Sequence, residues 1–497
     1  MGMLSLRNKR ESFTLLNTPV VLFILITITI LRVYSLYVSP IELSVDEAQY
    51  WHWSRNIDLG YFTKPPLIAW LIGFSTFIFG NEEWAVRLSA PITHLLISLV
   101  LWGSAKYAFG ANSGKIAALI WIFTPAASLG GFIISTDTPL LLFWSLSLLF
   151  LLISLRQNSS VTSLFVGVFL GFAFLSKYAA LYFFIFFIIW WLIYDRNTFI
   201  SIKNISIILL TSALIASTNL YWNYLNDFAT VNHTISNANL SVITLNYNNV
   251  IDFLSSQFLV FGPLLFLLYL LVIMNSFFKN REISLFAMIS FPIILLITVQ
   301  SFLKIANANW AVTAYVGATL LISYYVTMTK SSVFKIFFYL GFFLNIAISA
   351  YILTITINGS FYPLNLKSNP LRKNLGFENL ASKIHETFRK EKVSKIIFEK
   401  RGDISRFNYY LNRTDNDLEN KIFIKTNSLI PGNFYEANFN YDLINKTKGE
   451  KILIVKNVPD VTENYYDLHE IKLIKSITTK TIKNLKRTYY LYAGKIR

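Results

Sequence analysis

The chain has no cysteine among its 497 residues, which excludes disulfides, thiolate metal sites and cysteine nucleophiles. Its five histidines show no spacing typical of metal ligands. The sequence also lacks a Walker loop, a GxGxxG motif after a strand and a GxSxG motif. Nucleotide and nicotinamide chemistry therefore have no support. No cofactor is expected, and no divalent metal is indicated.

Charged residues are scarce as well, at 14%, whereas apolar residues make up 54% and aromatic residues 16%. This composition is typical of a multi-spanning membrane protein. The net charge of +17 is uneven, because Phe361 to Arg497 hold 26 Lys and Arg against 15 Asp and Glu. One interpretation is a lysine-rich genome, and the other is attraction to anionic headgroups or an anionic acceptor. Nucleic-acid binding is not expected of a chain committed to the membrane.

Long apolar runs predict the membrane part. A transmembrane helix needs roughly 20 mostly apolar residues, and we expect about 11–13 such helices. The basic start before Val20–Leu31 resembles a signal peptide, but we expect an uncleaved first helix. The apolar segment Pro66–Phe79 is brief and predicts a juxtamembrane or re-entrant helix. The candidate spans are Pro19–Val38, Pro91–Phe109, Lys115–Ile134, Pro139–Leu155, Val161–Leu175, Ala179–Tyr194, Ile202–Tyr221, Ile251–Asn275, Ile283–Leu303, Ala308–Thr327 and Val333–Ile357.

The distribution of positive charge predicts the topology, because cytoplasmic loops are rich in Lys and Arg. With a cytoplasmic N-terminus, the long outer loop Trp222–Val250 contains no Lys or Arg, and the short outer loops hold only Arg55, Lys64, Arg87, Lys177 and Lys304. Asp46 and Asp137 also fall on this outer side. The cytoplasmic ends would carry Arg7, Lys9, Arg10, Lys106, Lys115, Arg156, Arg196, Lys203, Lys279, Arg281, Lys330 and Lys335.

Beyond Ile357 the apolar runs shorten and charges become frequent. We therefore predict a membrane domain over residues 1–357 and a soluble α/β domain over residues 358–497, outside the cytoplasm. The pattern of Leu380–Phe388 predicts an amphipathic helix. Short apolar runs predict strands at Lys395–Phe398, Lys421–Lys425, Lys451–Val455, Ile471–Ile477 and Arg487–Tyr492.

The first outer loop combines carboxylates, aromatic residues and a constrained lysine. Asp46 and Glu47 either cap a helix or orient a nucleophile and accept its proton. Lys64 precedes two prolines that bar it from a helix interior, so its ammonium either snorkels or binds a phosphate. Charged groups at a membrane boundary usually have a function, and here they suit a charged lipid-linked substrate.

Later segments supply further candidates on the same predicted face. Asp137 precedes a Thr-Pro pair, where helix capping is the simpler explanation. Lys177 interrupts an apolar run, so it either snorkels or pairs with an anion. Asn309 begins a late helix, where a polar start is also expected. The substrate-binding candidates are Tyr50, Tyr61, Arg87, Asn309 and Trp310, with Arg55 beside Lys64 and Lys177 as donor-phosphate candidates.

Taken in order, these motifs resemble one family. The segments DEAQYWHWS, LGYFTKPPLIAW, FGNEEWAVRLSAP, STDTPLLLFW, LGFAFLSKYAAL and NANWAVTAY follow one another between Pro19 and Tyr325. The pattern looks like the bacterial branch of the protein-mannosyltransferase-like superfamily, which has the GT-C membrane fold. Its well-described relatives are aminoarabinose transferases of lipid A and transferases of the lipopolysaccharide core.

The resemblance implies inverting, metal-sparing sugar transfer from a polyprenyl-phosphate donor such as undecaprenyl phosphate, on the outer face of the inner membrane. The family's catalytic carboxylate falls on Asp46 beside Glu47, and its second acidic position falls on Asp137. Its first-loop lysine falls on Lys64, and the lysine closing the fifth span falls on Lys177. Many members carry additional C-terminal spans that are not expected here, which leaves the acceptor more open than the donor chemistry.

Three functions remain in competition. The first is a transferase acting on lipid A or the lipopolysaccharide core on the periplasmic face. The second is a protein O-glycosyltransferase with the same donor, although the C-terminal region lacks the β-trefoil repeats of eukaryotic protein mannosyltransferases. The third is a transporter or flippase, which predicts charges at the midplane of matched halves. The sequence shows no such halves. The transferred sugar and the acceptor atom are not encoded in any recognisable motif.

Overall fold

The computed structural model describes residues 17–195, 200–238, 245–360, 370–414, 418, 420–426, 428, 431–461, 466–480 and 486–497. The basic residues Arg7, Lys9, Arg10 and Arg196, used above for topology, lie outside these residues, and the orientation in the membrane stays a prediction. Two compact units are present. The first contains Met1–Tyr34, Lys64–Ile68 and Leu88–Leu353, and the second contains Ser35–Thr63, Ala69–Arg87 and Thr354–Arg497. The predicted domain boundary at residue 357 likewise stays a prediction.

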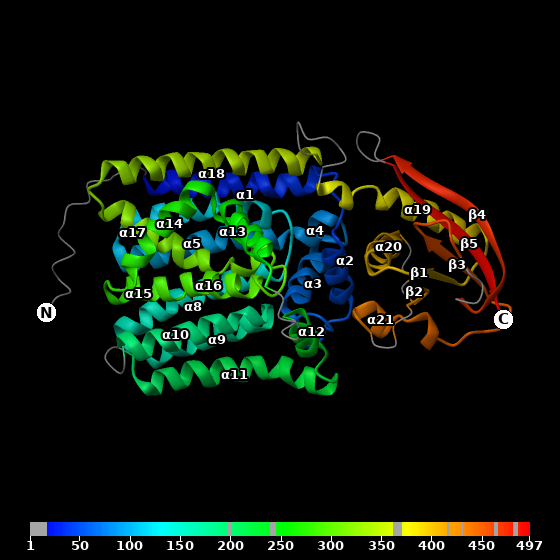
Figure 1. Ribbon diagram of the computed structural model, residues 1–497, viewed down its shortest axis with the longest axis horizontal. Helices are drawn as coiled ribbons and strands as arrows, with labels where there is room; N and C mark the ends of the chain where they lie inside the picture. Colours follow the sequence, from blue (N-terminus) through cyan, green and yellow to red (C-terminus); the bar gives the residue numbers. More distant parts are fainter. Residues whose placement is uncertain are drawn as a thin grey trace. The chain divides into compact units, whose positions relative to one another are not determined.

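The first unit is a helical bundle (Figure 1). Its apolar helices bury a continuous core that includes the fully buried rings of Trp121, Trp144 and Trp190. The helices are α1 (Thr18–Val38), α5 (Ser89–Phe109), α6 (Ala111–Ile122), α7 (Pro125–Gly130), α8 (Asp137–Gln157), α9 (Ser160–Ser176), α10 (Leu181–Trp190), α11 (Ile202–Leu225), α12 (Ala229–Ala238), α13 (Tyr247–Phe261), α14 (Pro263–Ser276), α15 (Arg281–Met288), α16 (Phe291–Ser301), α17 (Ala314–Met328) and α18 (Ser332–Asn358), with short turns η1 (Tyr178–Ala180), η2 (Trp191–Asp195) and η3 (Ala308–Ala311).

The chain is a multi-pass membrane protein, and among the described residues fewer helices are long enough to cross a membrane than the 11–13 spans predicted. Within the described residues, six helices are long and apolar enough to cross a membrane, or seven if the bent pair α13–α14 is one span. Four shorter apolar helices fall below that length. Breaks explain part of the difference. The expected span Lys115–Ile134 divides at Thr124, which caps α7 ahead of Pro125.

The bend between α13 and α14 depends on Gly262. The two helices meet at 106°, and Gly262 between them has a φ of 100°. A Cβ at this position would lie 1.8 Å from Oδ1 of Asn345, whose amide nitrogen donates to the Phe261 carbonyl at 3.0 Å. Only glycine fits this conformation and this space. The predicted continuous helix Ile251–Asn275 is therefore wrong at its centre.

The second unit contains a mixed five-stranded sheet in the order β2-β1-β3-β5-β4. Strand β1 pairs in parallel with β2 and β3, whereas β5 is antiparallel to both β3 and β4. The elements are α2 (Val45–Arg55), the C-terminal part of α3 (Leu67–Phe79), α4 (Glu83–Arg87), η5 (Pro370–Asn374), α19 (Phe377–Lys390), β1 (Lys395–Phe398), α20 (Arg401–Thr414), β2 (Ile422–Ile424), α21 (Phe434–Asn438), η7 (Tyr441–Leu443), β3 (Lys451–Lys456), β4 (Leu468–Lys480) and β5 (Lys486–Ile496).

Helix α20, which the apolar pattern did not reveal, packs on this sheet. Its Phe407 ring stacks on Phe398 of β1, with centroids 5.2 Å apart, and meets Tyr489 of β5 edge-on. The other predicted elements are present, with β1 over the predicted residues and with α19, β4 and β5 longer than expected. Helix α20 also packs against α2 and α19 of the same unit.

Candidate active site

Three predicted site residues meet in the first unit. Asp137 begins α8, Lys177 lies between α9 and η1 with an extended backbone (φ −164°), and Asn309 belongs to η3. The Lys177 ammonium lies 2.7 Å from one oxygen of Asp137, and the Asn309 amide donates to the other oxygen at 2.5 Å. Only 20% of the Lys177 side chain and 11% of the Asp137 side chain is exposed. The structure therefore brings these three residues into one cluster.

Packing beneath η3 fixes the position of Asn309. Gln257 of α13 donates from its amide to the Ala308 carbonyl at 3.2 Å, and its amide oxygen accepts from the Tyr315 hydroxyl at 2.7 Å. Trp310 is half-buried against the helical core. The backbone of η3, which carries the Asn309 amide, is consequently held by packing against α13 and α17, which favours a defined geometry for a charged ligand.

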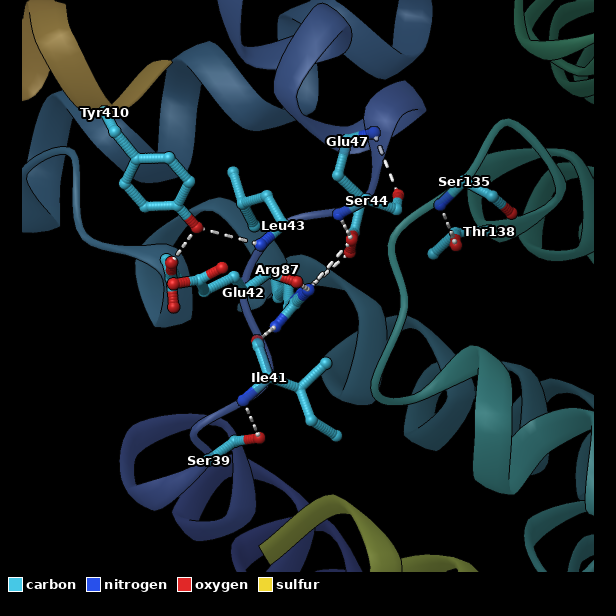
Figure 2. Close-up of polar contacts among 11 residues, drawn as sticks. Ser39, Ile41, Glu42, Leu43, Ser44, Glu47, Arg87, Ser135, Thr138 and Tyr410 are labelled. Atoms are coloured by element: carbon cyan, nitrogen blue, oxygen red, sulfur yellow. Dashed lines mark hydrogen bonds and ion pairs between the residues drawn. The ribbon is translucent and has the colours of Figure 1, made fainter. Parts of the chain in front are cut away.

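A second group of predicted residues belongs to the second unit, at the start of α2. Ser44 caps this helix in a reciprocal capping box with Glu47. Glu47 also forms a two-pronged ion pair with Arg87, at 2.8 and 2.9 Å, and both side chains are almost completely buried (Figure 2). Arg87 further donates to the carbonyls of Ile41 and Glu42 at 2.7 and 3.0 Å. The Glu47–Arg87 pair thus anchors the segment before α2 to the first turn of that helix, which carries Asp46.

Asp46 is oriented differently from Glu47. Its side chain is 60% exposed, and one oxygen lies 2.5 Å from the guanidinium of Arg401, the first residue of α20. Tyr410, farther along α20, accepts a hydrogen bond from the Leu43 amide at 3.1 Å and contacts Glu83 (Figure 2). The N-terminal turn of α2 is therefore held from both sides, while the Asp46 carboxylate remains accessible.

Aromatic packing surrounds the remainder of α2. Tyr61 stacks on Trp53 with centroids 4.8 Å apart, and Tyr50 packs against the same indole. Arg55 is exposed and lies over the Trp51 ring. The buried Tyr50 and Tyr61 rings therefore support the helix. Lys64 is half-buried and belongs to the first unit.

Burial favours the neutral form of several titratable groups near α2, among them Glu42 and His52. It raises the pKa of the Glu42 carboxyl to about 7, although the amides of Phe377 and Glu378 donate to that carboxyl at 2.6 and 3.0 Å. Burial, with a smaller contribution from Arg55, lowers the pKa of His52 to about 4. The Nδ1 atom of His52 lies 2.5 Å from the amide of Asn408 on α20. His52 is therefore a neutral, structural side chain near pH 7.

Sequence reasoning missed the residues that α20 brings to α2 and to the segment just before it. Arg401, Asn408 and Tyr410 are more than 300 residues from their partners, and no local spacing signals such pairs. Among the described residues, no group of three or more His, Asp or Glu side chains lies in a position to hold a metal ion. The assigned roles of the site residues remain proposals.

Known proteins with similar sequences are named as sugar transferases. Residues 63–222 match the Dolichyl-phosphate-mannose-protein mannosyltransferase family. The lipid A galacturonosyltransferase RgtD of Rhizobium johnstonii is 36% identical over 304 residues, which cover 60% of this chain and 64% of RgtD. The putative mannosyltransferase YycA of Bacillus subtilis is 27% identical over 168 residues, 33% of this chain and 24% of YycA. The chain therefore aligns with somewhat less than two thirds of RgtD.

The fold matches that of a solved GT-C protein. The crystal structure of ArnT from Cupriavidus metallidurans bound to undecaprenyl phosphate superposes with a TM-score of 0.69 and 13% identity, covering 96% of this chain and 98% of ArnT. The apo form superposes with a TM-score of 0.63 and 12% identity, covering 95% and 97% of the two chains. These matches show that the chain has the fold of ArnT and confirm the predicted fold class.

Proposed function

We propose that this chain, a multi-pass GT-C membrane protein related to lipid A glycosyltransferases, transfers a sugar from a polyprenyl-phosphate donor to lipid A or the lipopolysaccharide core. The observation that carries the proposal is the Lys177 ammonium held beside Asp137 and Asn309, in a chain 36% identical to a lipid A galacturonosyltransferase. Galacturonic acid is accordingly the first sugar to test. We place the reaction on the periplasmic face of the inner membrane.

The site must first stabilise the phosphate of the donor as the sugar leaves it. Breaking the bond between the sugar C1 and the phosphate oxygen leaves the electron pair on the polyprenyl phosphate. Fixed positive charge beside that oxygen stabilises the product as it forms. Lys177 and Lys64 are the lysines assigned to this task, with Arg55 as a supporting cation. Lys177 is suited to it because Asp137 and Asn309 hold its position without fully burying it.

The acceptor supplies the second demand. In an inverting transfer, the acceptor oxygen attacks C1 from the side opposite to the phosphate, and a hydroxyl acceptor must release a proton. We assign that proton to the exposed Asp46 carboxylate. A phosphate acceptor is already anionic, and with such an acceptor Asp46 would instead orient the donor sugar. Glu47 is a positioning residue in either mechanism, because its carboxylate is paired with Arg87.

The family match supports a second candidate acceptor. Residues 63–222 match a family named for transfer of mannose to protein, so a protein hydroxyl is the alternative to lipid A. Both acceptors require the same donor chemistry. The two functions are distinguished by whether lipid A or a protein gains the mass of the sugar.

Transfer by purified protein tests the proposal. The protein is reconstituted in liposomes with lipid A and a synthetic polyprenyl-phosphate galacturonate, and the products are analysed by mass spectrometry. We expect lipid A to gain one sugar. Lys177→Gln should lower the rate at least a hundredfold, whereas Lys106→Gln, at an exposed lysine near the end of α5, should not. Full activity of Lys177→Gln would refute the assignment of the donor site.

A further inference from the structure

Arg401 connects two side chains on the first turns of α2. Its Nη2 atom lies 2.5 Å from Oδ1 of Asp46, and its Nε atom donates to Oε1 of Gln49 at 2.9 Å. Asp46 and Gln49 are three residues apart and so share a face of the helix. A planar guanidinium can serve both acceptors at fixed angles, which a lysine ammonium on a flexible stem cannot do. The contact therefore specifies arginine.

The rest of α20 fixes the helix around this contact. Ser405 donates to the Val45 carbonyl at 2.6 Å, and Asn408 reaches His52. These contacts already join α20 to α2 and are mostly buried. The Arg401 pair is different, because 37% of the Arg401 side chain and 60% of the Asp46 side chain is exposed. An ion pair this exposed contributes little to stability. Stability therefore does not explain why Arg401 is placed to pair with both Asp46 and Gln49.

Gln49 provides an independent indication of a ligand. The residue is fully buried, and its amide nitrogen has no hydrogen-bond partner among the described residues. Rotating the amide would place a donor against the Arg401 Nε–H, so the present orientation is the one that Arg401 requires. Buried donors without a partner are rare, and functional sites are one place where they occur. Here the unpaired donor lies one helical turn from an exposed carboxylate.

We infer that Arg401 is a positioning residue for sugar transfer, which orients Asp46 and Gln49 toward an oxygen of the acceptor. The inference rests on the proposed function, because Asp46 is the group assigned to the acceptor. Under this inference the C-terminal residues of the chain supply part of the reaction machinery, beyond any role in docking the acceptor. The signature of such a role is a loss of turnover without a loss of folding.

Three variants in the reconstituted transfer assay test the inference. Arg401→Gln should lower kcat about a hundredfold, because a small misplacement of a reacting group has an effect of this size, and should leave the donor KM and the melting temperature unchanged. Arg401→Lys should recover about tenfold of that loss, because its ammonium can still pair with Asp46. Arg413→Gln is the matched control. It removes an arginine of the same helix that pairs with Glu82 and Glu378 instead of Asp46. Only 16% of the Arg413 side chain is exposed, so its loss should lower the melting temperature, but it should leave kcat within about twofold because these pairs do not orient Asp46.

A double variant separates a positioning role from a structural one. If Arg401 acts through Asp46, Asp46→Asn combined with Arg401→Gln should be no slower than Asp46→Asn alone. A kcat for Arg401→Gln within twofold of wild type, with Asp46→Asn inactive, would overturn the inference and leave the proposed function intact. Equal losses of kcat and melting temperature in Arg401→Gln and Arg413→Gln would also overturn it. Full activity of Asp46→Asn would instead remove the assignment of Asp46 in the proposed function.

Discussion

The buried ion pair between Arg87 and Glu47 gives the sharpest prediction about how the first loop is held. Arg87→Met keeps much of the side-chain length but removes every hydrogen bond that the guanidinium makes. Glu47 then retains its carboxylate in a site where only 1% of the side chain is exposed. The carbonyls of Ile41 and Glu42 lose the donors at 2.7 and 3.0 Å as well.

The magnitude follows from this geometry. Removing one partner of a buried pair generally costs about 3–5 kcal/mol, because the other charge stays buried without compensation. The two orphaned carbonyls place the expected loss in the upper half of that range. Combining Arg87→Met with Glu47→Gln should cost less than Arg87→Met alone, because no uncompensated charge remains.

Hydrogen exchange in detergent measures the loss of local stability in the segment that Arg87 anchors. A loss of about 4 kcal/mol predicts about 10³-fold faster exchange of the amides between residues 41 and 47, if these amides exchange through local opening. Arg389→Met, at an exposed arginine of α19, is the matched control and should change exchange there by less than about threefold. Equal exchange in the Arg87 and Arg389 variants would refute the conclusion that the ion pair anchors the loop.

Three other perturbations have defined outcomes. Asn309→Asp places a second carboxylate against Asp137 and should lower transfer more than tenfold at unchanged expression; wild-type turnover would contradict the cluster. The pKa of Glu42 is raised to about 7, so its contribution to stability declines as pH rises from about 4.5 to 7; the pKa of His52 is lowered to about 4, so its contribution declines as pH falls from about 6.5 to 4. Between about pH 4.5 and 6.5 the two contributions change in opposite directions, so the melting temperature should rise more steeply with pH in Glu42→Gln and less steeply in His52→Gln than in wild type; an unchanged pH dependence in both variants would contradict both assignments. Gly262→Ala should lower the melting temperature by several degrees, because its Cβ would collide with Asn345 and its φ is 100°; an unchanged melt would show that the bend tolerates a side chain.

Local patterns in the sequence predicted much of the fold. Continuous apolar runs identified α1, α8 and α18, and the short apolar run from Ile396 to Phe398 identified β1. The breaks were also visible locally, as Thr124-Pro125 and Gly262-Pro263, but a search for long apolar runs passes over them. Helix α20 was missed because polar residues and Gly402 separate its apolar residues in the sequence, so no apolar run marks it. Its packing on β1 and β5 stabilises the helical conformation instead.

The candidate site was predictable in its residue types and not in its pairings. The cap at Ser44 and the Asp-Thr-Pro start of α8 follow from local rules, so Asp46 and Asp137 were identifiable. The contacts of Glu47 with Arg87 and of Asp46 with Arg401 join residues 40 and 355 positions apart. Which carboxylate is buried and which stays accessible depends on these pairings. The proposal that Glu47 is a positioning residue and that Asp46 takes part in the chemistry therefore required the tertiary structure.

Mass spectrometry of lipid A and core from cells with and without this gene tests the central claim most directly. The account predicts that deletion removes the mass of one sugar, a hexuronic acid in the first instance. The wild-type gene should restore that mass, whereas Asp46→Asn, expressed at the same level, should not. Unchanged lipid A and core in the deletion strain would contradict the lipopolysaccharide assignment, and loss of a sugar from glycoproteins in the same cells would identify protein as the acceptor.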